Sequence, residues 1–594
     1  MRDKKLADDF KRNKHIYTKN SVYAKNLKAK IKNYALFVSK NGTDIAGNIF
    51  RIIEQLATGQ YGRIEIYLAY TNDAKSRIET ILQNYNLLQQ VYLVEYDSSR
   101  FFYLLARSKY FVSDAFVPFE YIKRKDQVLI STSHGTPIKV MGRDCTTETQ
   151  GLIQCTHTLA DYQTYSSNYM FDKLFAAFME KDLFQGHALK SGYARNSIFF
   201  NRERGQWLKE KLGYSGKTVF AYLPTFRGNA AVFQSQNQNE DIVRYCDELD
   251  EMLEDKYLLL VKLHNFNTEH IDFSKYKHIQ QFPLEYETYD VLNAVDGLIT
   301  DYSSVLFDFA VSRKKIVLFQ YDYQEYAEKR GTYLNWDELP FPVATNAKEL
   351  HREIASPKNY DDDSFYQTYC TYENPEAPKN ICKTIFGGQP SCEEFEIPHN
   401  GKKNVFIYAG RCQDNTPETL RFIDYMKVLD VSKFNFFLFF YEYDLLFKQR
   451  ILNDLPDGFQ YYSHLCDPVW TLEERKDFLR AKSDKGRKKS LQTLYASEAR
   501  RWFNDLPIDV YIDLCGKDAH ALQVAARMKD SVKKVVLYDD SMCGMQDVYE
   551  KFDFILQYGK YGGFGNSKIV EINRESSKID ICVNCRIIER ICGS

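Results

Sequence analysis

Polar side chains follow an apolar run in the segment LITDYSSVLFDFA. Thr300, Asp301, Ser303 and Ser304 stand between a predicted strand and a predicted helix. Hydroxyl groups and free backbone amides at the start of a helix favour an anion, because the helix dipole is positive there. Ordinary capping of the helix by Asp301 or Ser303 would explain the same residue types. The segment therefore indicates a phosphate-binding loop only in the company of other anion ligands.

Further candidate ligands follow two other apolar runs. In LPTFR, Arg227 offers a planar, permanently charged fork that suits phosphate oxygens, and Thr225 stands near it. In VKLHN, His264 ends a predicted strand. A structural ion pair for Arg227 and an ordinary strand-end imidazole for His264 are the alternatives. No DxD pair lies near these segments and no GxxxxGK[ST] loop occurs, so we expect Arg, Lys and helix ends, rather than a metal, to neutralise charge.

A third group of candidates comes from ISTSHGTPIK. His134 follows an apolar run, Gly135 permits close approach of the backbone, and Lys139 comes five residues after His134. A lone histidine is usually structural, so this segment by itself predicts little. Together with His264, it would bring one imidazole from each of two units to a common cleft.

All these segments lie in a chain that alternates short apolar stretches with amphipathic ones. The alternation predicts a βαβ series from about residue 33, which restarts after a charged helix with TVFAYLPTFR. We expect two consecutive doubly wound α/β units and a third Rossmann-like unit, with ligands at the carboxyl ends of the strands. The expected bounds are 33–203, 204–385 and 403–594 for the units and 386–402 for a linker rich in Gly, Pro and charge.

Length and composition are typical of a globular protein with several domains. A chain of 594 residues is too long to fold around a single hydrophobic core. Of its residues 44% are hydrophobic, and 79 basic residues balance 80 acidic ones. The thirteen cysteines follow no repeating spacing, as in reduced cytosolic proteins, and the pair Cys582 and Cys585 lacks a second ligand pair for zinc. With no long apolar run and no signal-peptide pattern, we expect a protein that stays inside the cell. The aromatic residues fall in strand and helix patterns, so nucleic acid is not a predicted partner.

The N-terminal segment 1–32 is strongly basic. It holds eleven Lys and Arg against three Asp, a net charge of +8. Such a segment can bind an anionic membrane surface electrostatically, and a solvated basic tail or a wet helix face is the alternative.

Taken together, the motifs resemble those of the CDP-glycerol glycerophosphotransferase family of teichoic acid and capsule synthesis. The resemblance covers about residues 33–385 and rests on HGTPIK, SGYARN, YLPTFR, KLH, ITDYSSVLFDFA and RKKIVLFQYDYQEY, in that order. It implies a GT-B-like fold, with an acceptor domain followed by a CDP-donor domain, on the cytoplasmic face of the membrane. It also implies a CDP-polyol donor, release of CMP, a lipid-linked or polymeric polyol-phosphate or glycan acceptor, and no cofactor or metal.

The resemblance implies roles for individual residues. His134 resembles the family's candidate catalytic base, and His264 and Asp301 would complete the catalytic group. The remaining positions divide into donor-binding residues (Thr225, Arg227, Thr300, Ser303 and Ser304) and residues that contact the acceptor or a phosphate (Gly135, Thr136 and Lys139).

Three departures from the family pattern bear on the choice of acceptor and donor. Ser133 replaces a usual Trp, Asn265 replaces a common Pro, and CTYENPEAPKN replaces a loop rich in Asp that contains Gly. The third unit resembles the N-terminal half of another GT-B transferase, so we expect it to lack transferase activity of its own and to serve acceptor binding or association.

Two other functions fit the sequence. One is a GT-B glycosyltransferase that uses a nucleotide sugar, and the other is an inert polymer- or membrane-binding subunit. The sequence also leaves three alternatives open: the donor is CDP-glycerol or CDP-ribitol, the enzyme is a primer enzyme or a polymerase, and the product is teichoic acid or capsule.

Overall fold

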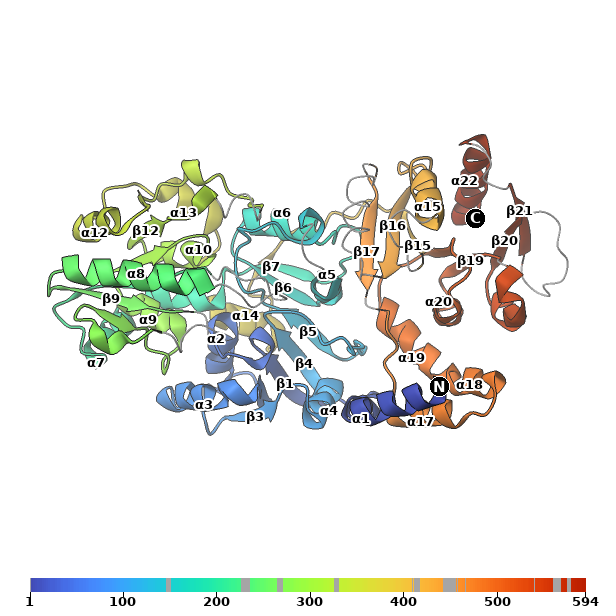
Figure 1. Cartoon of the computed structure of the whole chain (residues 1–594), viewed down its shortest axis with the longest axis horizontal. Helices are drawn as coiled ribbons and strands as arrows, with labels where there is room; N and C mark the ends of the chain where they lie inside the picture. Colours follow the sequence, from blue (N-terminus) through green and yellow to red (C-terminus); the bar gives the residue numbers. More distant parts are fainter. Residues whose placement is uncertain are drawn as a thin grey trace.

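Three mainly parallel sheets lie in a row in the computed structural model (Figure 1). The structure describes residues 2–145, 151–225, 236–263, 271–324, 331–408, 410, 417–441, 456, 458–464, 466–538, 540–558, 568–573 and 578–594. The first sheet lies between the other two in this view, with helices packed around each sheet.

The first sheet has eight strands, which are all parallel to their neighbours except β14. From edge to edge they are β14 (Glu393–Glu394), β7 (His187–Lys190), β6 (Tyr162–Tyr165), β5 (Val128–Ser131), β4 (Ser108–Ser113), β1 (Lys32–Val38), β2 (Glu65–Tyr70) and β3 (Val91–Glu95). The helices of this part are α1 (Arg2–Asn26), α2 (Gly47–Leu56), α3 (Lys75–Asn84), α4 (Ser99–Arg107), α5 (Gly151–Leu159), α6 (Asn168–Ala177) and α14 (Ala377–Ile385).

The second sheet has six parallel strands. They are β10 (Ile279–Gln281), β9 (Tyr257–Val261), β8 (Thr218–Leu223), β11 (Gly297–Thr300), β12 (Lys315–Phe319) and β13 (Val343–Ala344). The 3-10 helix η4 (Ala194–Phe200) leads into this part, whose helices are α7 (Arg202–Lys211), α8 (Gln236–Met252), α9 (Thr288–Ala294), α10 (Val305–Ala310), α12 (Ala347–Ala355) and α13 (Asp363–Tyr369).

The third sheet has seven parallel strands. They are β17 (Gln460–His464), β16 (Phe434–Tyr441), β15 (Lys403–Tyr408), β18 (Val510–Asp513), β19 (Lys533–Leu537), β20 (Phe554–Tyr558) and β21 (Lys568–Ile572). Its helices are α15 (Pro417–Met426), α17 (Leu472–Arg480), α18 (Asp484–Ser490), α19 (Gln492–Phe503), α20 (Ala519–Ala525), α21 (Gln546–Tyr549) and α22 (Lys578–Gly593).

Apolar strands explain why the sheets are parallel and covered. Every residue of β9, β12 and β16 is buried, as expected for strands with helices on both faces of the sheet. The alternation of apolar strands and amphipathic helices in the sequence therefore predicted the right class of fold.

The chain returns to the first sheet earlier than its composition indicated. Helix α14 packs on α2, with Ile381, Cys382 and Ile385 in the same apolar cluster as the β1 side chains Ala35 and Phe37. Strand β14, inside the segment expected to be a linker, pairs antiparallel with β7. Residues 377–394 thus belong to the first part: α14 covers the sheet with apolar side chains, and β14 adds a strand at its edge.

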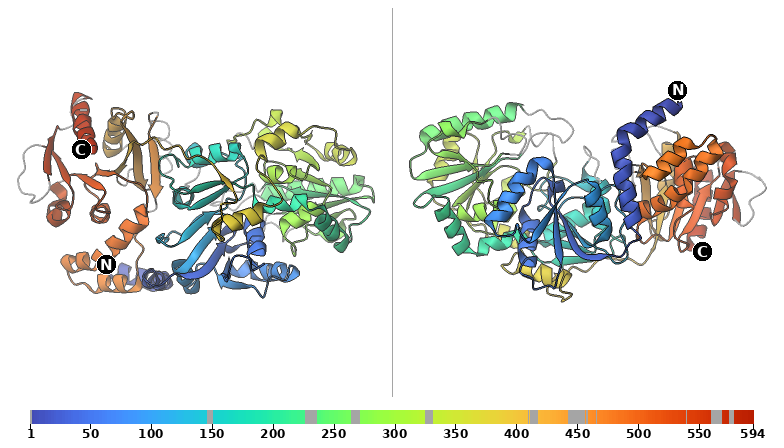
Figure 2. Two further views of the ribbon diagram at one scale, coloured as in Figure 1. Left: turned by 180° about the vertical axis from the view of Figure 1, so that it is seen from behind. Right: turned by 90° about the horizontal axis from the view of Figure 1, so that it is seen from below.

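Helix α1 is packed against folded parts of the chain on two sides. It contacts α4 of the first part and α17 of the third, and Figure 2 shows it between them. Tyr17 and Tyr23 are buried, Asn20 Nδ2 donates to the Trp470 carbonyl at 3.0 Å, and buried Lys19 pairs with Asp97. Segment 1–32 is therefore not a free tail. Among the described residues, no helix has both the length and the apolar character needed to span a membrane.

Candidate functional site

His134 stands in the loop after β5, with an exposed side chain. Its Nδ1 lies 2.9 Å from the backbone carbonyl oxygen of Asp114. Because a carbonyl only accepts hydrogen bonds, Nδ1 must carry a proton, so the neutral imidazole has its lone pair on Nε2. Ser133 holds the tight turn before it with φ of +52°, a conformation that side-chain-bearing residues rarely adopt. The geometry thus presents Nε2 as a proton acceptor.

Asp114 joins the loops that follow β1, β4 and β5. Its carboxylate accepts hydrogen bonds from the Ser39 hydroxyl at 2.9 Å and the Lys40 amide at 2.7 Å, while its carbonyl holds His134. Burial raises the pKa of Asp114, against the opposing effects of these donors and of His134. The imidazole is therefore oriented by the backbone of a buried, well-anchored residue.

Asp301 ties together the two candidate loops of the second sheet. Its fully buried carboxylate accepts from the Thr225 amide at 2.8 Å, the Thr225 hydroxyl at 2.5 Å and its neighbour's amide, Tyr302 N, at 2.6 Å. The Thr300 hydroxyl donates to the Leu223 carbonyl at 2.8 Å. Thr225, Thr300 and Asp301 therefore lie together, and their contacts fit a part in shaping the loops.

The two sheets meet where Gly135 lies against Ser304. A Cβ on Gly135 would stand 2.5 Å from Ser304 Oγ and 3.0 Å from Ser304 Cβ, so a side chain at this position would crowd Ser304. Ser303 and Ser304 are half-buried and precede the six-residue helix α10, which Ser304 does not cap with its side chain. The loop thus keeps hydroxyl groups at the contact with the His134 segment.

The rest of the HGTPIK segment is anchored on both sides. The Thr136 hydroxyl lies 3.2 Å from that of Ser166, inside the first part. Lys139 pairs with Thr332 of the second part as an antiparallel bridge. The structure therefore brings His134, Gly135, Thr136 and Lys139 to the junction with the second sheet. The predicted ligands Arg227 and His264 lie outside the described residues.

Sequence reasoning missed a buried ion pair beside this contact. Arg195 donates through Nε and Nη2 to both carboxylate oxygens of Asp308 at 2.9–3.1 Å, and through Nη1 to the His134 carbonyl at 2.9 Å. Burial lowers the pKa of Arg195, but Asp308 more than compensates and raises it above its ordinary value. The motif SGYARN contained the signal, an arginine soon after a strand, but its partner is 113 residues away.

The segment CTYENPEAPKN is joined to the same pair through Asn196, which donates to both Asp308 and Glu373. Its Glu373 accepts from Asn196 Nδ2 at 2.9 Å and from the Tyr193 amide at 3.2 Å. Burial raises the pKa of Glu373 to about 8. The segment that departs from the family pattern therefore holds the SGYARN segment in place through Glu373.

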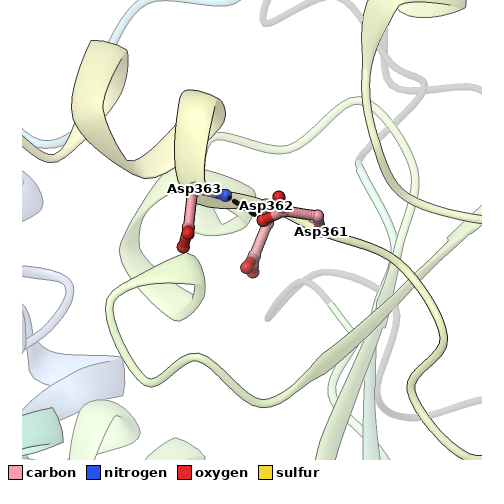
Figure 3. A group of neighbouring side chains, drawn as sticks. All are labelled: Asp361, Asp362 and Asp363. Atoms are coloured by element: carbon pink, nitrogen blue, oxygen red, sulfur yellow. Dashed lines mark hydrogen bonds between the residues drawn. The ribbon is translucent and has the colours of Figure 1, made fainter.

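One group of carboxylates in the described residues has the spacing of a metal site. Figure 3 shows it at the start of α13, where the Asp363 amide donates to Asp361 at 2.9 Å. Arg313 pairs with Asp363 and, at 3.0 Å, with Asp362, which also pairs with Lys358 at 2.9 Å. Two of the three carboxylates are thus already paired with cations, so we assign no metal to the group.

The part of the chain that forms the first two sheets matches a known protein family. The sequence profile of the family described as CDP-Glycerol:Poly(glycerophosphate) glycerophosphotransferase matches residues 21–387, from within α1 to just beyond α14. The chain belongs to this family. It is therefore a transferase of the glycerophosphotransferase type, and the match excludes the third sheet.

Individual relatives agree with this assignment. A teichoic acid poly(glycerol phosphate) polymerase of Bacillus spizizenii is 25% identical over 375 residues, which are 59% of this chain and 91% of the relative. A teichoic acid glycerol-phosphate primase of Bacillus subtilis is 27% identical over 357 residues, which are 57% of this chain and 88% of the relative. Both resemblances confirm the family that the motifs indicated.

A solved structure gives the fold. The wall teichoic acid polymerase TagF superposes with a TM-score of 0.52 at 22% identity, over 65% of this chain and 98% of that chain. At this identity the likeness establishes architecture alone. It confirms the predicted GT-B-like α/β fold with Rossmann-like sheets.

Proposed function

We propose that this chain transfers glycerol phosphate from CDP-glycerol to a membrane- or polymer-linked acceptor of teichoic acid or capsule synthesis and releases CMP. Family membership and the relatives' names support the donor and the reaction class. The observation that carries the proposal is the oriented His134 beside the contact between Gly135 and Ser304. This contact supports a site in which a proton acceptor from one sheet works beside the Ser304 hydroxyl of the other.

The proposed reaction is an in-line displacement at phosphorus. The acceptor hydroxyl oxygen forms a bond to the phosphorus that bears glycerol, and the bond from this phosphorus to the CMP oxygen breaks. The hydroxyl proton goes to His134 Nε2, which the hydrogen bond from Nδ1 to Asp114 leaves as the accepting nitrogen. His134 is thus assigned as general base.

Charge on the donor phosphates requires donors and cations around the cleft. We assign this part to the Ser303 and Ser304 hydroxyls, with Thr225, Thr300 and Asp301 holding the loops and Arg227 and His264 as further ligands. No metal or other cofactor is part of the proposal.

The experiment is CMP release by the purified protein with CDP-glycerol, CDP-ribitol or nucleotide sugars, each with and without a lipid-linked glycerol-phosphate acceptor. Acceptor-dependent release from CDP-glycerol supports the proposal. Turnover with a nucleotide sugar alone would make the chain a glycosyltransferase, and no turnover with any donor would favour an inert binding subunit.

We further propose that the protein docks peripherally on the cytoplasmic, anionic face of the membrane and takes no nucleic acid partner. Support comes from α1, whose outward cations Lys5, Lys11, Arg12 and Lys14 are exposed although the helix is packed. Changing these four to Glu should reduce binding to anionic vesicles at low salt. The matched control changes four exposed cations of the second part to Glu, namely Lys275, Lys277, Lys348 and Arg352. Equal loss in both variants would sink the assignment to α1.

A further inference from the structure

Arg195 connects the backbone of the proposed base with the helix that follows the proposed donor loop. It lies in η4, at the end of the first part, and Asp308 lies in α10 of the second. The guanidinium donates to the His134 carbonyl on one side and to both Asp308 oxygens on the other. We infer that Arg195 is a positioning residue that sets His134 against the Ser303–Ser304 loop, an inference that rests on the proposed function.

The arginine fork is suited to this task. A guanidinium is planar and directs its N–H groups in fixed directions, so one side chain can reach a carbonyl and a carboxylate together. A lysine carries the same charge but offers one ammonium at the end of a flexible chain. Arg195 therefore fixes an angle between the two loops as well as a distance.

The surroundings hold the fork in one orientation. The side chains of Arg195 and Asp308 are 4% and 2% exposed. The guanidinium carbon lies 4.3 Å from the ring centroid of Tyr193 and 5.1 Å from that of Tyr289. Asp308 also accepts from the Tyr289 hydroxyl at 3.0 Å and from Asn196 Nδ2 at 3.0 Å. Because both members of the pair are fixed, their connection is rigid.

Rigidity here bears on the rate of the proposed reaction. Asp308 lies on the short helix α10, which begins directly after Ser304, so holding Asp308 also holds the start of that helix. In-line attack needs the base and the donor phosphates aligned, and a misplacement of about 1 Å can cost on the order of 10²-fold in rate. The buried guanidinium acts through the loops rather than on the reacting atoms.

A purely structural ion pair between the sheets is the competing explanation, and the molecule contains a matched control. Arg51 of α2 is 3% exposed and donates to Asp290 of α9 at 2.7 Å, so it also links the first part to the second. It also forms ion pairs with Glu54 and Glu287. Arg51 thus resembles Arg195 in burial and charge pairing, but within the described residues it has no hydrogen bond or ion pair with the His134 segment.

The first test compares Arg195→Lys with Arg51→Lys in acceptor-dependent CMP release, with folding checked by circular dichroism and thermal melting. Arg195→Lys should lower kcat by about 10- to 100-fold, with the donor KM changed by less than about threefold. Arg51→Lys should keep kcat within about twofold at a similar loss of melting temperature. Unchanged kcat in folded Arg195→Lys, or equal losses in both variants, would overturn the inference.

The second test asks whether Arg195 acts through His134. In a His134→Ala background there is no imidazole to position, so adding Arg195→Lys should lower the residual kcat little further. The same fold-loss in both backgrounds would contradict the inference. If Arg195→Lys does not fold, the pair Arg195→Gln with Asp308→Asn removes both charges together and takes its place. Lack of CMP release by the wild-type protein would instead contradict the proposed function.

Discussion

The junction between the first two sheets and the carboxyl edge of the third sheet are built from the same elements, parallel strands followed by polar loops. At the first, loops from two sheets meet at Gly135 and Ser304, and Arg195 links them. At the third, Asp513 ends β18 next to β15, where the strand order reverses and doubly wound sheets usually bind ligands. The two edges differ in what their buried carboxylates contact.

Asp308 and Asp513 show that difference. Asp308 binds a guanidinium that also reaches the other loop. Asp513 is fully buried and accepts only from the nearby Cys515 and Gly516 amides, at 2.9 and 2.8 Å, and its Oδ2 has no partner within the described chain. One carboxylate joins two parts of the molecule, whereas the other shapes its own turn. In line with the sequence analysis, we expect transferase chemistry at the first edge and not at the third.

The largest expected effect is that of His134→Ala. Loss of a general base should lower kcat by about 10²- to 10⁴-fold and leave the donor KM largely intact. Steady-state CMP release at several donor concentrations measures both constants. If donor affinity falls as much as turnover, His134 binds the donor and is not the base.

A smaller loss is expected from Gly135→Ala, which tests the contact between the loops. The new Cβ would stand 2.5 Å from Ser304 Oγ and 3.0 Å from Ser304 Cβ, so the serine must turn away or the loops must shift, and kcat should fall about 10- to 100-fold. Gly544→Ala, in the third part, is the control, because its Cβ would meet only Lys488 Nζ at 3.8 Å. Equal activity of the two variants would show that the close approach is unimportant.

The smallest effect on activity is expected from Asp513→Asn, whose consequence is on stability. Burial raises the pKa of Asp513 to about 7, so the folded state binds a proton that the unfolded state releases above its ordinary pKa of 3.8. Its contribution to stability is therefore full below pH 3.8 and is lost as pH rises to about 7, on the order of 4 kcal/mol in total.

Urea unfolding of the third part between pH 5 and pH 8 checks this. The wild-type unfolding free energy should fall more steeply with pH than that of Asp513→Asn, while acceptor-dependent CMP release stays within about twofold. A loss of CMP release comparable to that of Gly135→Ala would show that the third sheet also contributes to activity, and would contradict the difference drawn between the two edges.

The sequence predicted the features that depend on local pattern. Apolar strands alternating with amphipathic helices predicted the three sheets, and His134, Thr225 and Ser304 became candidates because they follow such strands. It did not predict the pairing of Arg195 with Asp308, since that depends on how two sheets pack. Strand β14 escaped notice because two glutamates carry no periodic signal, and α1 because its buried tyrosines lie among many lysines.

The most direct test of the central claim follows the transferred group itself. CDP-glycerol labelled in the glycerol moiety is incubated with the protein and a lipid-linked glycerol-phosphate acceptor, and the label in the acceptor is compared with the CMP released. We predict one labelled unit in the acceptor for each CMP, in the wild type and not in His134→Ala. CMP released without label in the acceptor would show hydrolysis instead of transfer and would contradict the account.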